Sequence, residues 1–304
     1  MNDQRKVHLA LTVVSVMFGL SYILTKLIIN EVPPQAWAFY RVVIAAATLL
    51  PFILDRRILP AFKLPRLWLS GFFGIVLNQL LFAEGLKRTT PSHSSLINAC
   101  IPAITLVLSI AAARETWNPR RTTGIAIAII GVLVLIGRPQ GGQLFGDLLT
   151  LANVLSFSIF FVISQPLARK YPALALTGVY LLEGVLLLGL NLGLHSAFDP
   201  AATLVHSLLK APLATHALMI GVAIQSTTVT YTLNTWALGR ATPSQVAAYV
   251  TLQPVVATLL SAAFFHERLG WAFVPAFVMI TGGVFLSSLR WRRTKAAQAA
   301  AAHS

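Results

Sequence analysis

Apolar stretches of about twenty residues follow one another along nearly the whole chain. Only 11% of the 304 residues are charged and 56% are hydrophobic, with a mean hydropathy of +0.75, whereas a soluble domain carries about 25% charged residues. A bilayer core of about 30 Å needs about 20 helical residues. The runs therefore predict an all-α polytopic membrane protein rather than a β-barrel, whose strands are short and alternate in polarity.

Turn-forming segments such as "NEVPPQ" and "RETWNPRR" divide these runs. The first run is too long for a secretory signal, and no small-x-small cleavage site follows it. We therefore expect ten transmembrane helices, over residues 7–29, 34–54, 66–87, 91–113, 120–137, 146–168, 173–194, 213–239, 243–265 and 271–289.

Basic residues predict the orientation of these spans. The net charge is +14, but it lies in short clusters between apolar runs, which argues against a nucleic-acid partner. If the N-terminus is inside, the loops on the opposite side hold only Lys87, Arg88, Arg138, Lys210 and Arg268. All other basic residues outside the spans then face the cytoplasm, so both termini of this multi-pass protein are expected there, in an inner (plasma) membrane.

Two parts of the chain are related by an offset of 152 residues. A gap-free alignment of 82–116 with 234–268 has ten identical positions, and Gly131 and Gly283 keep the same offset. Two five-span halves, 7–140 and 146–290, follow from this repeat. Because five is odd, the halves enter the membrane from opposite sides, as in many secondary transporters. The basic tail 291–304 is expected to be disordered and cytoplasmic.

The repeated segments resemble the EamA branch of the drug/metabolite transporter superfamily. The resemblance rests on "GLKRTTPSHSSLINACIPAITLVLS", "ALGRATPSQVAAYVTLQPVVATLLS", "FYRVVIAAATLLPF" and the glycine-rich "VMITGGVFLSS", and it covers about residues 10 to 290. It implies a ten-helix fold that exports or exchanges small metabolites. It does not name the substrate, because members of the family move amino acids, drugs and other metabolites.

Each repeat contains Thr-Pro-Ser and a second proline eleven residues later. Thr90 and Thr242 are suited to capping a helix that begins at the following proline. Pro102 and Pro254 fall inside the expected spans, where a proline removes one backbone hydrogen bond and bends the helix. Two interpretations remain open: a static bend that improves packing, or a hinge in each half.

Polar side chains inside spans are costly in lipid and therefore indicate a pathway or a structural bond. Many are spaced four apart, and so share a helix face, and Tyr231 matches Gln79 by the 152 offset. Each Ser or Thr taken singly is explained as well by a bond to its own helix or to a neighbouring one. We expect a cavity between spans 1, 3, 4, 6, 8 and 9, with candidate lining residues Asn78, Gln79, Asn98, Tyr231, Asn234, Tyr249 and Gln253.

Four charged residues lie well inside the expected spans, away from their ends. Lys26, Arg41 and Glu84 lie in the outer third, and Glu84 is expected to pair with Arg41 or Lys26, because a lone buried charge is costly. A structural pair would close the outer side or extend to the membrane interface. A functional one would bind a substrate carboxylate at the cation, or a coupling proton at Glu84. Glu183 has no ionic partner nearby in sequence, and either couples protons or bonds a neighbouring helix.

No G-x-x-x-x-G-K-[ST] loop occurs, so the expected energy source is an ion gradient or substrate exchange. The sequence predicts a secondary transporter, without cofactor or metal, that exports amino acids or drug-like amphiphiles by alternating access. A membrane-embedded enzyme and a non-transporting sensor or scaffold are the alternatives. The expected partners are a small-molecule substrate and the bilayer, and the protein is either a monomer or a homodimer.

Overall fold

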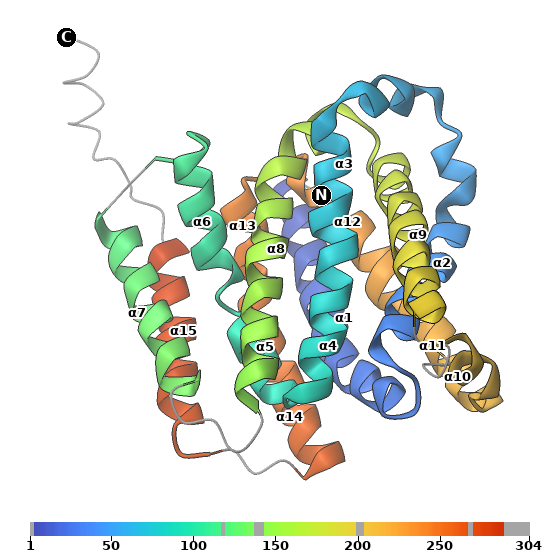
Figure 1. Cartoon of the computed structure of the whole chain (residues 1–304). Helices are drawn as coiled ribbons and strands as arrows, with labels where there is room; N and C mark the ends of the chain where they lie inside the picture. Colours follow the sequence, from blue (N-terminus) through green and yellow to red (C-terminus); the bar gives the residue numbers. More distant parts are fainter. Residues whose placement is uncertain (1–2, 117–118, 137–142, 199–203, 267–269, 289–304) are drawn as a thin grey trace.

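The computed structural model describes residues 3–116, 119–136, 143–198, 204–266 and 270–288. All regular elements within these ranges are helical, and most run along one common direction (Figure 1). The expected all-α fold is confirmed over the described ranges. The predicted tail 291–304 lies outside them.

Eight helical stretches are long and apolar enough to cross a membrane, and two shorter apolar helices accompany them. The eight are α1 (Asp3–Glu31), α2 (Pro34–Ile53), α3–α4 (Pro65–Gly71 and Asn78–Arg88), α5–α6 (Pro91–Asn98 and Ile101–Ala111), α8 (Gln143–Lys170), α9 (Ala173–Phe198), α11–α12 (Leu213–Ala223 and Thr230–Leu238) and α13–α14 (Pro243–Ala248 and Gln253–Phe265). The shorter helices are α7 (Pro119–Ile136) and α15 (Phe273–Ser288), which pack against each other. The connecting segments include α10 (Leu204–Lys210) and the 3-10 helix Arg56–Lys63.

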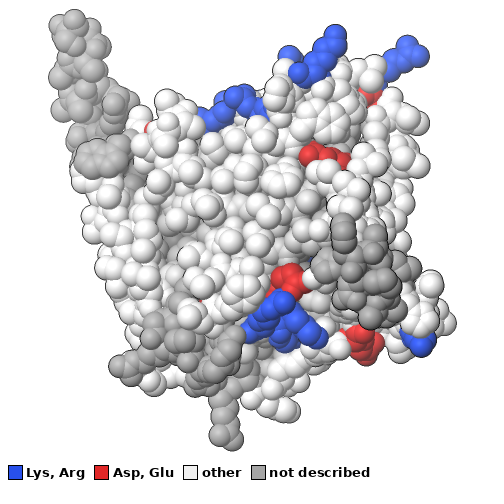
Figure 2. Space-filling view, in the orientation of Figure 1, with Lys and Arg blue, Asp and Glu red and all other residues white. Residues whose placement is uncertain are grey.

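On the face of the molecule seen in Figure 2, charged side chains gather toward the two ends of the helix bundle, and the band between them is mostly uncharged. Large apolar side chains such as Leu186 and Phe285 are exposed on its sides, which suits lipid and not water. Burial and the neighbouring charges of Arg66 and Arg169 hold the pKa of Arg114 below its usual value. Three separate connections therefore bring positive charge to one end of the bundle.

The predicted helix starts at the repeated Thr-Pro-Ser are confirmed. The Thr90 hydroxyl accepts a hydrogen bond from the His93 backbone N–H at 3.3 Å, at the start of α5. The Thr242 side chain caps α13 in the same way, and Gln245 completes a reciprocal capping box. In each case the proline occupies the first turn, where its missing N–H is not needed.

The second proline of each repeat lies at a helix interruption rather than at a bend in a continuous helix. Pro102 is in the first turn of α6, after α5 has ended at Asn98. Pro254 is in the first turn of α14, after a short 3-10 segment, Tyr249–Leu252. The expectation of a mid-helix bend is thus replaced by two helix starts, because a proline is well tolerated at the start of a helix.

The interrupted helices pack against each other in opposite directions. The segment α5 contacts α14, and α6 contacts α13. The helices α1 and α8 flank this pair, since α1 contacts α14 and α8 contacts both α5 and α6. This arrangement brings the two interruptions to the middle of the bundle.

Two π-helical turns, which sequence patterns did not predict, interrupt two further spans. They cover Phe72–Leu77 between α3 and α4 and Ile224–Val229 between α11 and α12, and are separated by 152 residues. A π turn within an α-helix is rare and often occurs at a functional site. The helix α9 packs against the first turn and α2 against the second.

Candidate functional site

A small cavity lies between the spans. Its volume is about 40 Å³. A single water needs about 10–15 Å³ by that measure, so this conformation admits a few waters. An organic metabolite would require the surrounding helices to move apart. The lining residues are Phe18, Ser21, Tyr22, Arg41, Asn78, Gln79, Phe82, Asn98, Ile101, Asn153, Phe157, Tyr231 and Gln253.

Five of the seven candidate lining residues lie at this cavity: Asn78, Gln79, Asn98, Tyr231 and Gln253. Asn234 is buried elsewhere on α12. The Tyr249 hydroxyl bonds to the ring of His8, and its backbone carbonyl accepts from Ser15 at 2.6 Å.

Sequence reasoning missed Ser21 and Tyr22 on α1 and Asn153 on α8. These helices were expected at the cavity, but the residues have no counterpart at the 152 offset that would have identified them.

The Tyr231 hydroxyl joins the two halves of the chain. It accepts from Gln79 Nε2 at 2.9 Å and donates to Asn78 Oδ1 at 2.7 Å. Asn153 Nδ2 donates to the Asn78 backbone carbonyl at 2.8 Å. Gln79 and Tyr231 occupy matched positions of the repeat and here contact each other directly. The side-chain amide of Gln79, the hydroxyl of Tyr231 and the side-chain amide of Asn78 thus form one continuous, buried chain of hydrogen bonds.

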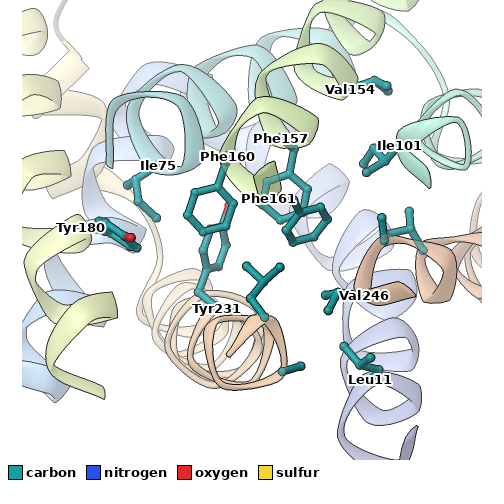
Figure 3. Close-up of a cluster of buried hydrophobic side chains, with 14 of the residues drawn as sticks. Leu11, Ile75, Ile101, Val154, Phe157, Phe160, Phe161, Tyr180, Tyr231 and Val246 are labelled. Carbon is teal, nitrogen blue, oxygen red and sulfur yellow. The ribbon is translucent and has the colours of Figure 1, made fainter. Parts of the chain in front are cut away.

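Three phenylalanine rings of α8, those of Phe157, Phe160 and Phe161, lie beside Tyr231 (Figure 3). The ring of Phe157 is 5.8 Å from that of Tyr231 and 4.5 Å from that of Phe161, measured between centroids. Phe160 lies 6.3 Å from Tyr231 and 5.7 Å from Tyr180 on α9. The site thus combines apolar rings with amide and hydroxyl groups, as small-molecule sites usually do.

Arg41 on α2 brings a positive charge to the cavity. Its Nε donates to Thr227 Oγ1 at 3.0 Å and its Nη2 to Ser226 Oγ at 2.8 Å, so it is bound to the second π turn. Its guanidinium carbon lies 5.3 Å from the centre of the Trp37 ring. The side chain is buried, with 2% of the residue exposed.

The expected pairing of Glu84 with Arg41 or Lys26 is wrong. Glu84 pairs instead with Arg88, one helical turn further along α4. Lys26 Nζ donates to the backbone carbonyls of Leu86 at 2.6 Å and Thr89 at 2.7 Å. The carbonyls at a helix C-terminus carry partial negative charge and attract a cation. Backbone carbonyls at the end of α4 therefore stabilise the charge of Lys26, and no carboxylate is needed for this.

Glu183 on α9 lies outside the cavity. It is 6% exposed, and its Oε2 has no hydrogen-bond partner among the described residues. This oxygen lies against the backbone of Gly71, where a Cβ atom would be only 2.0 Å from it. The neighbouring Tyr180 hydroxyl bonds to Ser164 Oγ at 2.8 Å. A carboxylate oxygen is therefore held against the helix end that precedes the first π turn.

Comparison with known proteins agrees with this architecture. The sequence model of the EamA-like transporter family matches residues 5–137 and again 144–289. A probable amino-acid metabolite efflux pump of Escherichia coli (strain K12) is 28% identical over 294 residues, which cover 94% of this chain and 96% of that protein. A WAT1-related protein of Arabidopsis thaliana is 25% identical over 302 residues, or 86% of this chain and 79% of the relative.

The fold also resembles that of a protein of known crystal structure. The TM-score is 0.62 at 19% identity, over 93% of this chain and 96% of the other. At that identity the similarity concerns the fold alone. The two family matches together span almost all of the described helices, and the chain therefore belongs to the EamA-like transporter family.

Proposed function

We propose that this protein is a secondary transporter that exports small organic metabolites, such as amino acids or drug-like amphiphiles, by alternating access. The observation that carries the proposal is the buried Asn78–Tyr231–Gln79 chain at a cavity between interrupted helices. Polar groups and broken helices inside a membrane are tolerated where they surround a substrate pathway. Similarity to the probable amino-acid metabolite efflux pump of Escherichia coli supports transport out of the cell.

We propose a ten-helix arrangement of two inverted repeats, 7–140 and 146–290, with α7 and α15 as the fifth and tenth spans. The support comes from the two separate family matches, the 152-residue spacing of the π turns and the antiparallel packing of the interrupted helices. Both termini would lie in the cytoplasm of a bacterium, on the side where Arg66, Arg114 and Arg169 gather.

Flux of unmodified solute separates this proposal from an enzyme or a non-transporting scaffold. The purified protein is reconstituted in liposomes loaded with a mixture of labelled amino acids, and external label is followed with time. We expect labelled amino acids to leave the liposomes chemically unchanged. Liposomes that contain the same solutes but no protein should not release them. Altered solute would support an enzyme, and wild-type protein with no flux of any solute would contradict the proposal.

The helix interruptions provide a test of alternating access. Pro102→Ala and Pro254→Ala each restore a backbone N–H and allow the helix to continue across its break. We expect counterflow to slow in both variants, while the melting temperature stays at or above that of the wild type. Pro51 lies inside α2 and is exposed, so Pro51→Ala is the matched control and should transport normally. Normal rates in both test variants would show that the two interruptions are static and do not take part in alternating access.

Glu183 is proposed as the proton-coupling residue. Phe160 contacts both Tyr180, which neighbours Glu183, and Tyr231 at the cavity. The Glu183 carboxylate also lies against Gly71, directly before the π turn that leads to Asn78. Buried carboxylates in membranes commonly bind and release protons in transporters. A proton on Glu183 can thus influence the cavity through one aromatic ring and one helical turn.

Glu183→Gln mimics the protonated state permanently. We expect this variant to lose accumulation driven by a pH gradient while keeping solute exchange at equal pH. Glu84→Gln serves as control, because Glu84 is paired with Arg88 at the helix end, and it should keep gradient-driven accumulation. Both activities are measured in the same liposomes, and gradient-driven accumulation in Glu183→Gln would rule out the coupling role.

A further inference from the structure

We infer that Arg41 is the anion-binding group of the cavity, and that the transported solute presents a carboxylate to it. The inference rests on the proposed transport function and names the substrate class. The side chain is buried and lines the cavity, yet the groups that hold it are the neutral hydroxyls of Ser226 and Thr227.

The charge of Arg41 has no counter-ion among the described residues, none of which places a carboxylate within salt-bridge distance of its guanidinium. The remaining lining groups are aromatic or aliphatic side chains, hydroxyls and amides. A buried cation without a counter-ion is strongly unfavourable, and an anion that enters the cavity relieves this cost. The empty cavity is therefore electrostatically suited to a solute with one negative charge.

The guanidinium retains donor capacity for such a solute. Nε and Nη2 are used by Thr227 and Ser226, whereas Nη1 has no hydrogen-bond partner among the described residues. The bonds to Thr227 and Ser226, with the contact to the Trp37 ring, hold the group in a defined orientation. An oriented guanidinium recognises carboxylates by charge-assisted hydrogen bonds.

A carboxylate fits better than a phosphate ester. Arg41 is the one cation among the lining residues, and a phosphate near two negative charges would leave one unbalanced. The neighbouring amides of Asn78 and Gln79 and the hydroxyl of Tyr22 complete a neutral polar surface for the rest of the solute.

The test uses purified full-length protein in detergent and two matched sets of ligands. Each set contains an amino acid, its amine without the carboxylate and its acid without the amine. The first is leucine, isoamylamine and 4-methylpentanoate, and the second is phenylalanine, phenethylamine and 3-phenylpropanoate. Apparent affinities come from the ligand-dependent rise in melting temperature. We expect wild type to favour the carboxylate-bearing members over the amines by roughly 10- to 100-fold, the range for a hydrogen bond to a charged group.

Arg41→Gln should abolish this preference, and Arg41→Lys should retain part of it because the positive charge remains. Tyr171→Phe, which lies outside the cavity, is the control and should keep the full preference. If Arg41→Gln fails to fold, Arg41→Lys decides: a preference reduced below that of Tyr171→Phe supports the inference, and an unchanged preference contradicts it. Equal binding of amines and acids by wild type, or an unchanged preference in a folded Arg41→Gln, would overturn the inference. A carboxylate preference without any flux in liposomes would support the site and contradict the transport function.

Discussion

Tyr231→Phe is expected to reduce transport by roughly 10- to 100-fold, because the hydroxyl is both acceptor and donor at the centre of the cavity. Its removal leaves the Gln79 amide and the Asn78 side-chain carbonyl without this buried partner, at a cost of about 1–3 kcal/mol for each group. The aromatic ring remains, so the contacts with Phe18 and Phe157 persist. The loss is therefore assigned to the hydroxyl and not to packing.

Initial counterflow rates in proteoliposomes check this expectation, with the amount of folded protein set equal. Tyr171→Phe is the matched control, since the buried Tyr171 hydroxyl has no hydrogen-bond partner among the described residues. It should transport at the wild-type rate. Adding Gln79→Leu to Tyr231→Phe should cost less than the sum of the single effects, because the two groups share one bond. A Tyr231→Phe protein with normal rates would show that the polar chain is structural only.

Gly283→Ala is expected to destabilise the fold by about 1–3 kcal/mol, the usual range for overpacking. A Cβ atom at Gly283 would lie 2.5 Å from the Gly124 carbonyl oxygen and 2.7 Å from the Ala128 backbone nitrogen on α7. Both are backbone atoms, so no side chain can turn away, and α7 and α15 must separate. At Gly131, the repeat partner, a Cβ would lie 2.9 Å from both Ile280 Cγ1 and Met279 Cβ and 3.1 Å from the Ile280 backbone nitrogen, so the two helices are in close contact there as well.

The neighbouring glycine provides a control on the same helix. A Cβ at Gly282 would meet nothing within 4 Å, so Gly282→Ala should leave stability unchanged or raise it slightly, as alanine favours helices. Unfolding of both variants in detergent by increasing denaturant gives the free energies to compare. Equal stability of Gly282→Ala and Gly283→Ala would contradict the close backbone contact between α7 and α15.

The helical architecture follows largely from the apolar composition and from the residues that begin and end helices. The long apolar runs exclude a water-soluble fold. The Thr-Pro pairs at 90–91 and 242–243 begin helices as expected. The family resemblance, carried by the same segments, is confirmed by the match over almost the whole chain. These features are local, because capping, proline geometry and lipid compatibility depend on neighbouring residues in sequence.

The candidate site was predicted less completely. The offset of 152 led to Gln79 and Tyr231, which do meet. It did not indicate Asn153 or Tyr22, which reach the cavity from α8 and α1. Neither π turn has a composition that distinguishes it from an ordinary helical turn, and no pattern showed that Arg41 would bind one of them.

By itself, the sequence determined that this chain is helical and membrane-embedded, and that its polar residues cluster in a few matched spans. Those properties follow from the solvent, since lipid accepts only backbones that satisfy their own hydrogen bonds. Only the tertiary structure decided the partners: Glu84 with Arg88, Lys26 with the end of α4, and Arg41 with the hydroxyls of α11–α12's π turn. A buried charge can be satisfied by a carboxylate, a hydroxyl or a helix end, and which of these lies within reach depends on how distant helices pack.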